Sequence, residues 1–121
     1  MPHAAPALPA CYYCGLIADT VDHVTPRHVL DRREALGRMA LPRVLTVPAC
    51  RECNSAIGAR ICPTLADRKR FVKDWLRRRH AALLRVPDWT EAELADLGPQ
   101  MERYVRTGVR HRDIVRSRLA W

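Results

Sequence analysis

Two Cys-x-x-Cys pairs constrain the fold of this chain more than any other feature. Cys11 and Cys14 form the first pair, and Cys50 and Cys53 form the second. Two residues between cysteines allow both sulfurs of a tight turn to face one ion, and a second pair completes a tetrahedral shell. Because four thiolates leave no open coordination position, the pattern predicts a structural zinc site. Any chemistry must then come from the residues that the zinc holds in place.

The composition is typical of one small domain that a metal ion stabilises. Hydrophobic residues make up 48% of the 121 residues but aromatic residues only 6%. With few large side chains the core is small, so a bound metal ion would help to stabilise the fold. Tight cysteine pairs without a visible signal peptide favour metal ligands in a reducing compartment over disulfides. We expect a cytoplasmic protein with no membrane span, since no apolar stretch reaches the ~20 residues that a span needs.

The net charge favours a polyanionic partner. Lys and Arg number 21 against 13 Asp and Glu, which gives +8 at pH 7. Basic groups that neutralise phosphates release counterions, so we expect a nucleic-acid partner; a solvated basic surface is the alternative. The charge is concentrated over residues 64–86, where apolar residues at helical spacing predict one long helix. The basic side chains expected to contact phosphates are Arg68, Lys69, Arg70, Lys73, Arg77, Arg78 and Arg79.

The predicted fold class is α+β, in three parts. Residues 1–10, rich in Pro and Ala, predict a flexible arm. Residues 11–63 predict a zinc-stapled finger, and residues 64–121 predict a helical, arginine-rich extension packed on it. In this extension an acidic segment lies between two basic ones, which favours a helical hairpin.

Local patterns predict the elements of the finger. Short strands are expected over residues 18–25 and 43–47. A loop or a few helical turns are expected over residues 27–42. Asn54 or Ser55 is expected to cap a helix that begins beside the last cysteine.

Asp22 and His23 are candidates for chemistry on the first strand. Successive strand residues face opposite sides, so Asp22 could point towards a cation while His23 reaches the other side of a substrate. A neutral imidazole can take a proton from water as a general base. The oxygens of Asp22 and Asn54 suit Mg²⁺ or Mn²⁺, which would stabilise the leaving oxygen of a phosphodiester. Alternatively, Asp22 and His23 support the cysteine turns, and Asn54 is only a helix cap.

Cys-x-x-Cys, Asp22-His23-x-x-Pro26 and Cys-x-x-Cys-Asn54, in this order, resemble the HNH (His-Asn-His) nucleases of the His-Me finger group. The resemblance covers about residues 11–60. It implies a ββα-metal finger that hydrolyses DNA phosphodiester bonds with one divalent cation. His23 matches the general base, Asp22 and Asn54 match the metal-side residues, and the four cysteines match the structural zinc ligands found in many members.

Two hypotheses about function follow. The first is a DNA endonuclease or nickase in which His23 activates water. The second is a catalytically degenerate zinc module that binds nucleic acid or a protein partner, for example within a phage or mobile-element assembly. One departure from the family pattern favours the second hypothesis, because Leu45 stands where the family has the Asn that helps to orient the histidine.

Overall fold

A computed structural model describes residues 8–24 and 45–121. Residues 1–7 of the predicted arm, the predicted loop over 27–42 and the start of the second predicted strand lie outside the described residues. The described part is a small mixed α/β structure with a two-stranded sheet. Its elements are β1 (Thr20–His23), β2 (Thr46–Ala49), α2 (Arg51–Ile57), α3 (Leu65–Arg79), α4 (Ala81–Leu84), α5 (Glu91–Ala95) and α6 (Pro99–Ala120).

β1 and β2 form an antiparallel pair in which Asp22 lies opposite Val47. The second strand was predicted to end at Val47, but it continues through Pro48 to Ala49. Proline is tolerated here since each strand of a two-stranded sheet has a free edge. The carbonyl of Pro48 accepts a hydrogen bond from the backbone N–H of Tyr12 at 2.8 Å. This bond ties the first cysteine turn to the sheet.

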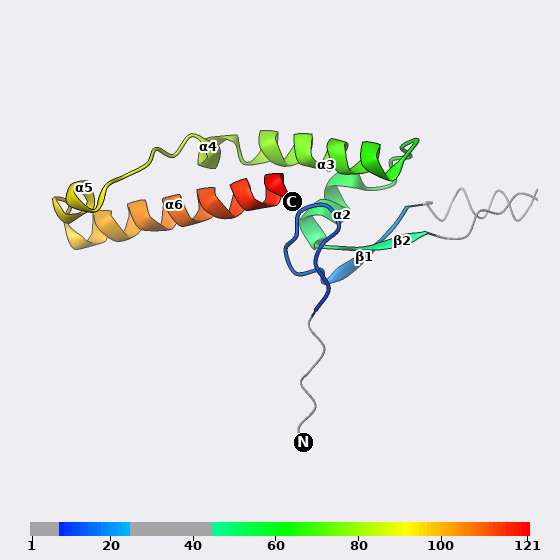
Figure 1. Cartoon of the computed structure of the whole chain (residues 1–121), viewed down its shortest axis with the longest axis horizontal. Coiled ribbons are helices and arrows are strands. Elements are labelled where there is room, and N and C mark those ends of the chain that lie inside the picture. Colours follow the sequence, from blue (N-terminus) through cyan, green and yellow to red (C-terminus); the bar gives the residue numbers. More distant parts are fainter. Residues whose placement is uncertain (1–7, 25–44) are drawn as a thin grey trace, which may run out of the picture.

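α2 starts directly after the second strand and carries the second cysteine pair. It begins at Arg51, earlier than predicted, because Cys50 takes the extended conformation of a helix N-cap. α2 packs against β1 and α3, so it lies between the sheet and the helical part (Figure 1). α3 begins after Thr64, whose side chain accepts a hydrogen bond from the backbone N–H of Asp67.

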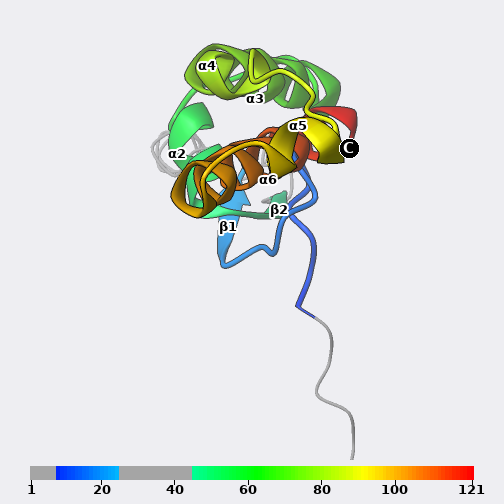
Figure 2. The same cartoon turned by 90° about the vertical axis from the view of Figure 1, so that its left-hand side faces the viewer.

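The helices after α2 form an antiparallel hairpin (Figures 1 and 2). α3 and α4 run along α6, and α5 lies at the far end, where the chain turns back. The single helix predicted over residues 64–86 is interrupted at His80, whose backbone leaves the helical region (φ −108°, ψ 23°). α6, in contrast, continues through Gly108. No helix in the described ranges is both long and apolar enough to cross a membrane.

The core lies where the sheet, α2 and α3 meet. Val72 and Leu76 of α3 are almost completely buried, and both belong to the same cluster as Val47 and Ile57. The four predicted zinc ligands are part of this cluster. The four-cysteine cluster is therefore continuous with the hydrophobic core.

Candidate metal centre and its surroundings

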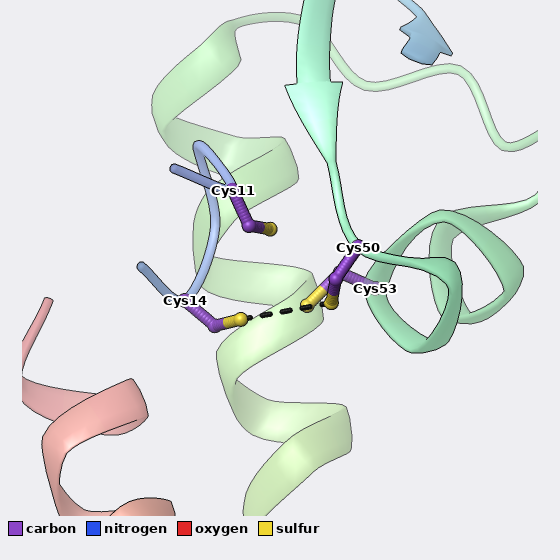
Figure 3. A group of neighbouring side chains, drawn as sticks. All are labelled: Cys11, Cys14, Cys50 and Cys53. Atoms are coloured by element: carbon purple, nitrogen blue, oxygen red, sulfur yellow. Dashed lines mark hydrogen bonds between the residues drawn. The ribbon is translucent and has the colours of Figure 1, made fainter. Parts of the chain in front are cut away.

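The four cysteines predicted as zinc ligands come together in one buried cluster (Figure 3). Their sulfurs lie within 4.8 Å of one another, and the Cys14 and Cys50 sulfurs are 3.7 Å apart. Zinc–thiolate bonds of about 2.3 Å give a regular tetrahedron with edges of about 3.8 Å. The size and the donors of the cluster therefore fit a metal ion such as zinc.

The first cysteine turn is closed by Gly15. Its backbone N–H donates to the carbonyl of Cys11 at 2.9 Å, and its φ of +78° lies in the region that favours glycine. A Cβ at this position would lie 2.5 Å from the Trp121 ring. Gly15 therefore meets both a backbone and a packing requirement, and the second depends on the end of α6.

The thiols oppose one another's ionisation. Hydrogen bonds from Cys14 and Cys53 lower the pKa of Cys11, whereas hydrogen bonds to Cys11 and Cys14 raise the pKa of Cys53. Burial raises the pKa of Cys50. Cys11 is therefore favoured to ionise over Cys50 and Cys53, and a cation in the cluster would favour the thiolate forms of these two as well. Metal binding at this cluster would displace protons.

Arg118 of α6 lies directly against the cluster. Its Nη2 is 3.9 Å from the sulfur of Cys50 and 3.8 Å from that of Cys53, and its Nη1 is 2.6 Å from Oε1 of Glu52. The side chain is buried. Burial alone would lower the pKa of Arg118, but the neighbouring Cys14 thiol and Glu52 carboxylate raise it overall, so the guanidinium stays charged. No motif or spacing in the sequence points to this residue.

Glu52 connects the second cysteine pair to two other helices. Besides Arg118, it contacts His80 at the end of α3, with Oε1 3.1 Å from Nε2. Burial raises the pKa of Glu52, but hydrogen bonds from His80 and Arg118 outweigh this effect and lower it overall. Glu52 is therefore held as an anion beside the cysteine cluster.

Asp22, predicted to hold a catalytic cation, lies inside the protein. Both of its carboxylate oxygens accept hydrogen bonds from Nη2 of Arg68, at 2.8 and 3.0 Å, and Oδ2 also accepts one from the Tyr13 hydroxyl. Arg68 further donates to the Arg60 carbonyl at 2.7 Å. Asp22 and Arg68 are 2% and 0% exposed. In this arrangement Arg68 occupies the carboxylate that was predicted to face a divalent cation.

His23 and Asn54 lie near the surface. His23 is half-buried and lies on the opposite face of β1 from Asp22, as the alternation of a strand predicts. Asn54 donates its side-chain N–H to the hydroxyl of Thr20 at 3.2 Å and to the carbonyl of Val21 at 3.4 Å. Asn54 thus links α2 to β1 and does not act as the predicted helix cap, since α2 begins before it.

Two of the basic residues predicted to contact nucleic acid have partners inside the protein. Arg68 has no exposed surface and cannot contact a phosphate, so we exclude it from the residues proposed to bind nucleic acid. Lys73 donates to the backbone oxygens of Leu119 at 3.0 Å and Trp121 at 2.8 Å, which ties α3 to the end of α6.

The other five lie at or near the surface of α3. Lys69 is half-buried over the ring of Tyr12, at 5.3 Å from its centroid. Arg70 and Arg77 are exposed, and each forms an ion pair with an aspartate of the same helix. Arg78 and Arg79 are exposed and have no ion-pair partner within residues 8–24 and 45–121. These last two are the best placed to meet an external anion.

Comparisons with protein-family models, curated proteins and solved structures return no match for this chain. The resemblance to HNH nucleases therefore stays a prediction from the sequence motifs. The four-cysteine cluster, by contrast, is a feature of the structure itself.

Proposed function

We propose that this chain is a zinc-stabilised finger that binds nucleic acid and in which Asp22 has a structural role. The observation that carries the proposal is the buried group of Asp22, Arg68 and Tyr13. In this group the Asp22 carboxylate is bonded to Arg68, whereas in a nuclease of the HNH type it would bind the catalytic cation. The proposed fold is the ββα finger, with β1, β2 and α2 held together by zinc at the four cysteines.

A cation at Asp22 would have to displace Arg68. The displaced guanidinium would stay buried without its carboxylate, and breaking a buried ion pair by losing one partner costs about 3–5 kcal/mol. Mg²⁺ also loses its water shell reluctantly. Both effects favour Asp22 as a cross-link between β1 and α3 over a cation ligand.

Exposed arginines beside an aromatic side chain support nucleic-acid binding. Arg79 and Arg51 line a surface pocket between α2 and α3, together with Trp75 and Ser55, and Arg51 also forms an exposed ion pair with Asp19 at 3.3 Å. Guanidinium groups bind phosphates, and an indole ring can stack on an unpaired base. The pocket also contains Glu52, whose charge is compensated by Arg118 at 2.6 Å. We propose this pocket as the centre of the nucleic-acid contact.

The second candidate function is metal-dependent DNA cleavage. It is favoured by the placement of His23 on the face of β1 opposite Asp22, beside a helix that carries Asn54. In this function His23 would accept a proton from water, and Mg²⁺ or Mn²⁺ would stabilise the leaving oxygen. It requires Arg68 to release Asp22 when substrate binds.

One experiment separates the two functions. Zinc-loaded protein is mixed with plasmid and with short single- and double-stranded DNA, with Mg²⁺, Mn²⁺ or neither, beside a His23→Ala variant. Chelator is avoided because it would also remove zinc. Binding without cleavage, equal in both proteins, supports the binding module. Nicking that needs Mg²⁺ or Mn²⁺ and disappears in His23→Ala establishes the nuclease instead, and absence of any binding overturns both.

A further inference from the structure

The C-terminal end of α6 reaches the cysteine cluster at two points and is tied to α3 at a third. Arg118 contacts two of the sulfurs, at 3.8 and 3.9 Å. The Trp121 ring lies against Gly15, in the first cysteine turn. Lys73 of α3 binds the backbone oxygens of Leu119 and Trp121, at 3.0 and 2.8 Å. The end of a helix remote in sequence thus lies against both halves of the cluster.

The charge of a zinc–thiolate site explains why a positively charged side chain, Arg118, lies beside the cysteines. Zinc with four thiolates has a net charge of −2, and a buried charge is costly unless it is paired. Arg118 supplies positive charge within hydrogen-bonding reach of Cys50 and Cys53 and is itself only 6% exposed. Groups around a metal site commonly orient the ligands and adjust their basicity in this way.

Packing alone does not account for Arg118. Its Nε is buried without a hydrogen-bond partner in the described part of the chain, and leaving such a donor unpaired is unfavourable. An apolar side chain would fill the same space without this penalty. The contribution of the guanidinium is therefore electrostatic: its positive charge interacts with the cysteine sulfurs and with Glu52, 2.6 Å away.

We propose that Arg118 is a positioning residue of the zinc site that stabilises the thiolates and couples zinc binding to the docking of α6. The inference rests on the zinc site of the proposed function. N–H···S hydrogen bonds from a cation draw negative charge from the sulfurs, which makes them less reactive towards protons and electrophiles. Because coupling is reciprocal, zinc in turn holds the end of α6 in place.

The test compares Arg118→Met and Arg118→Lys with Arg116→Met, a control on the same helix whose side chain is 53% exposed. Zinc content is measured first, followed by the rate of zinc release during alkylation with iodoacetamide. Loss of groups around a metal site weakens metal binding by about 10- to 100-fold. We expect Arg118→Met to release zinc about 10-fold faster than wild type, Arg118→Lys to be intermediate and Arg116→Met to match wild type.

Replacing zinc by Co²⁺ gives a readout that packing alone would not change. The sulfur-to-cobalt charge-transfer absorption should shift in Arg118→Met, remain close to wild type in Arg118→Lys and be unchanged in Arg116→Met. If Arg118→Met fails to fold, Trp121→Ala tests the coupling instead. It does not change Arg118 itself but should speed zinc release by loosening the end of α6.

The possible failures are distinguishable. Wild-type protein without zinc would overturn the proposed zinc site itself. Full zinc content in every variant, with equal release rates and identical Co²⁺ spectra, would leave the zinc site intact and overturn the role of Arg118. Unchanged release in Trp121→Ala would overturn the coupling to α6.

Discussion

The Nη2 atom of Arg68 lies 3.0 Å from Oδ1 and 2.8 Å from Oδ2 of Asp22, and both side chains are buried. The pair joins β1 to α3 across more than forty residues of sequence. Tyr13, from the first cysteine turn, donates to the same carboxylate. Three segments of the fold therefore meet at one buried ion pair.

Replacing Arg68 by Met should destabilise the protein strongly. The buried Asp22 carboxylate would lose its cation, and we expect the free energy of unfolding to fall by about 3–5 kcal/mol. Denaturant unfolding of the zinc-loaded protein measures this loss. Arg70→Met, at an exposed position of the same helix, should change it by less than about 0.5 kcal/mol.

The double variant Arg68→Met with Asp22→Leu should recover much of that loss, because no charge then remains unpaired. Equal instability in the double and the single variant would show that packing, not charge, makes Arg68 important.

Alkaline pH should weaken the fold through Tyr13. Burial, followed by the neighbouring Asp22, raises the pKa of Tyr13 above its ordinary value of 10.0. The unfolded chain then loses this proton at a pH where the folded protein keeps it, so stability is full below pH 10 and falls as pH rises above it. Unfolding measured between pH 8 and about 11 should show this decline in wild type. Tyr13→Phe should show a shallower decline, and an equal slope in both proteins would contradict the assignment.

The four clustered cysteines should be essential for zinc binding and stability, and the fifth cysteine, Cys62, should not. Cys50→Ser should lose zinc and unfold the finger, because structural zinc commonly contributes about 10 kcal/mol or more of apparent binding free energy. Cys62 is half-buried and lies outside the cluster, so Cys62→Ser should keep the zinc content and the melting temperature of wild type. Metal analysis and thermal unfolding test both variants, and a Cys50→Ser protein that melts like wild type would exclude a structural metal.

Adding a methyl group at Gly15 should loosen the end of α6. The new Cβ would lie 2.5 Å from the Trp121 ring, on a residue with φ of +78°. We expect Gly15→Ala to lower the free energy of unfolding by about 1–3 kcal/mol. Gly98→Ala is the matched control, since nothing lies within 4 Å of its added Cβ. Similar stability losses in the two variants would argue against the contact with Trp121.

Arg79→Gln should weaken nucleic-acid binding without affecting the fold. Arg79 is exposed and lines the pocket with Trp75, so its loss should remove one phosphate contact and reduce the slope of log K against log salt by about 1. Arg116→Gln, at an exposed position on α6, provides the control. Binding titrations at several salt concentrations measure the slopes, and equal slopes in the two variants would place the contact elsewhere.

Features set by local spacing could be predicted from the sequence. Each Cys-x-x-Cys turn directs both of its sulfurs to one side, and the charged segment that begins at residue 64 forms a helix as predicted. Asp22 and His23 lie on opposite faces of β1. These features depend on residues a few positions apart, where turn geometry and the periodicity of a strand or helix determine which way a side chain points.

Only the tertiary structure decided which charged residues are partners. Arg68 looked like one more basic residue on a charged helix, and Asp22 like a free ligand, yet each neutralises the other inside the core. Arg118 lies 68 and 65 residues from Cys50 and Cys53 in the sequence and meets their sulfurs only because α6 folds back along α3. Periodicity indicates which face of a helix is apolar, but an arginine on that face stays buried only where folding brings an anion to it.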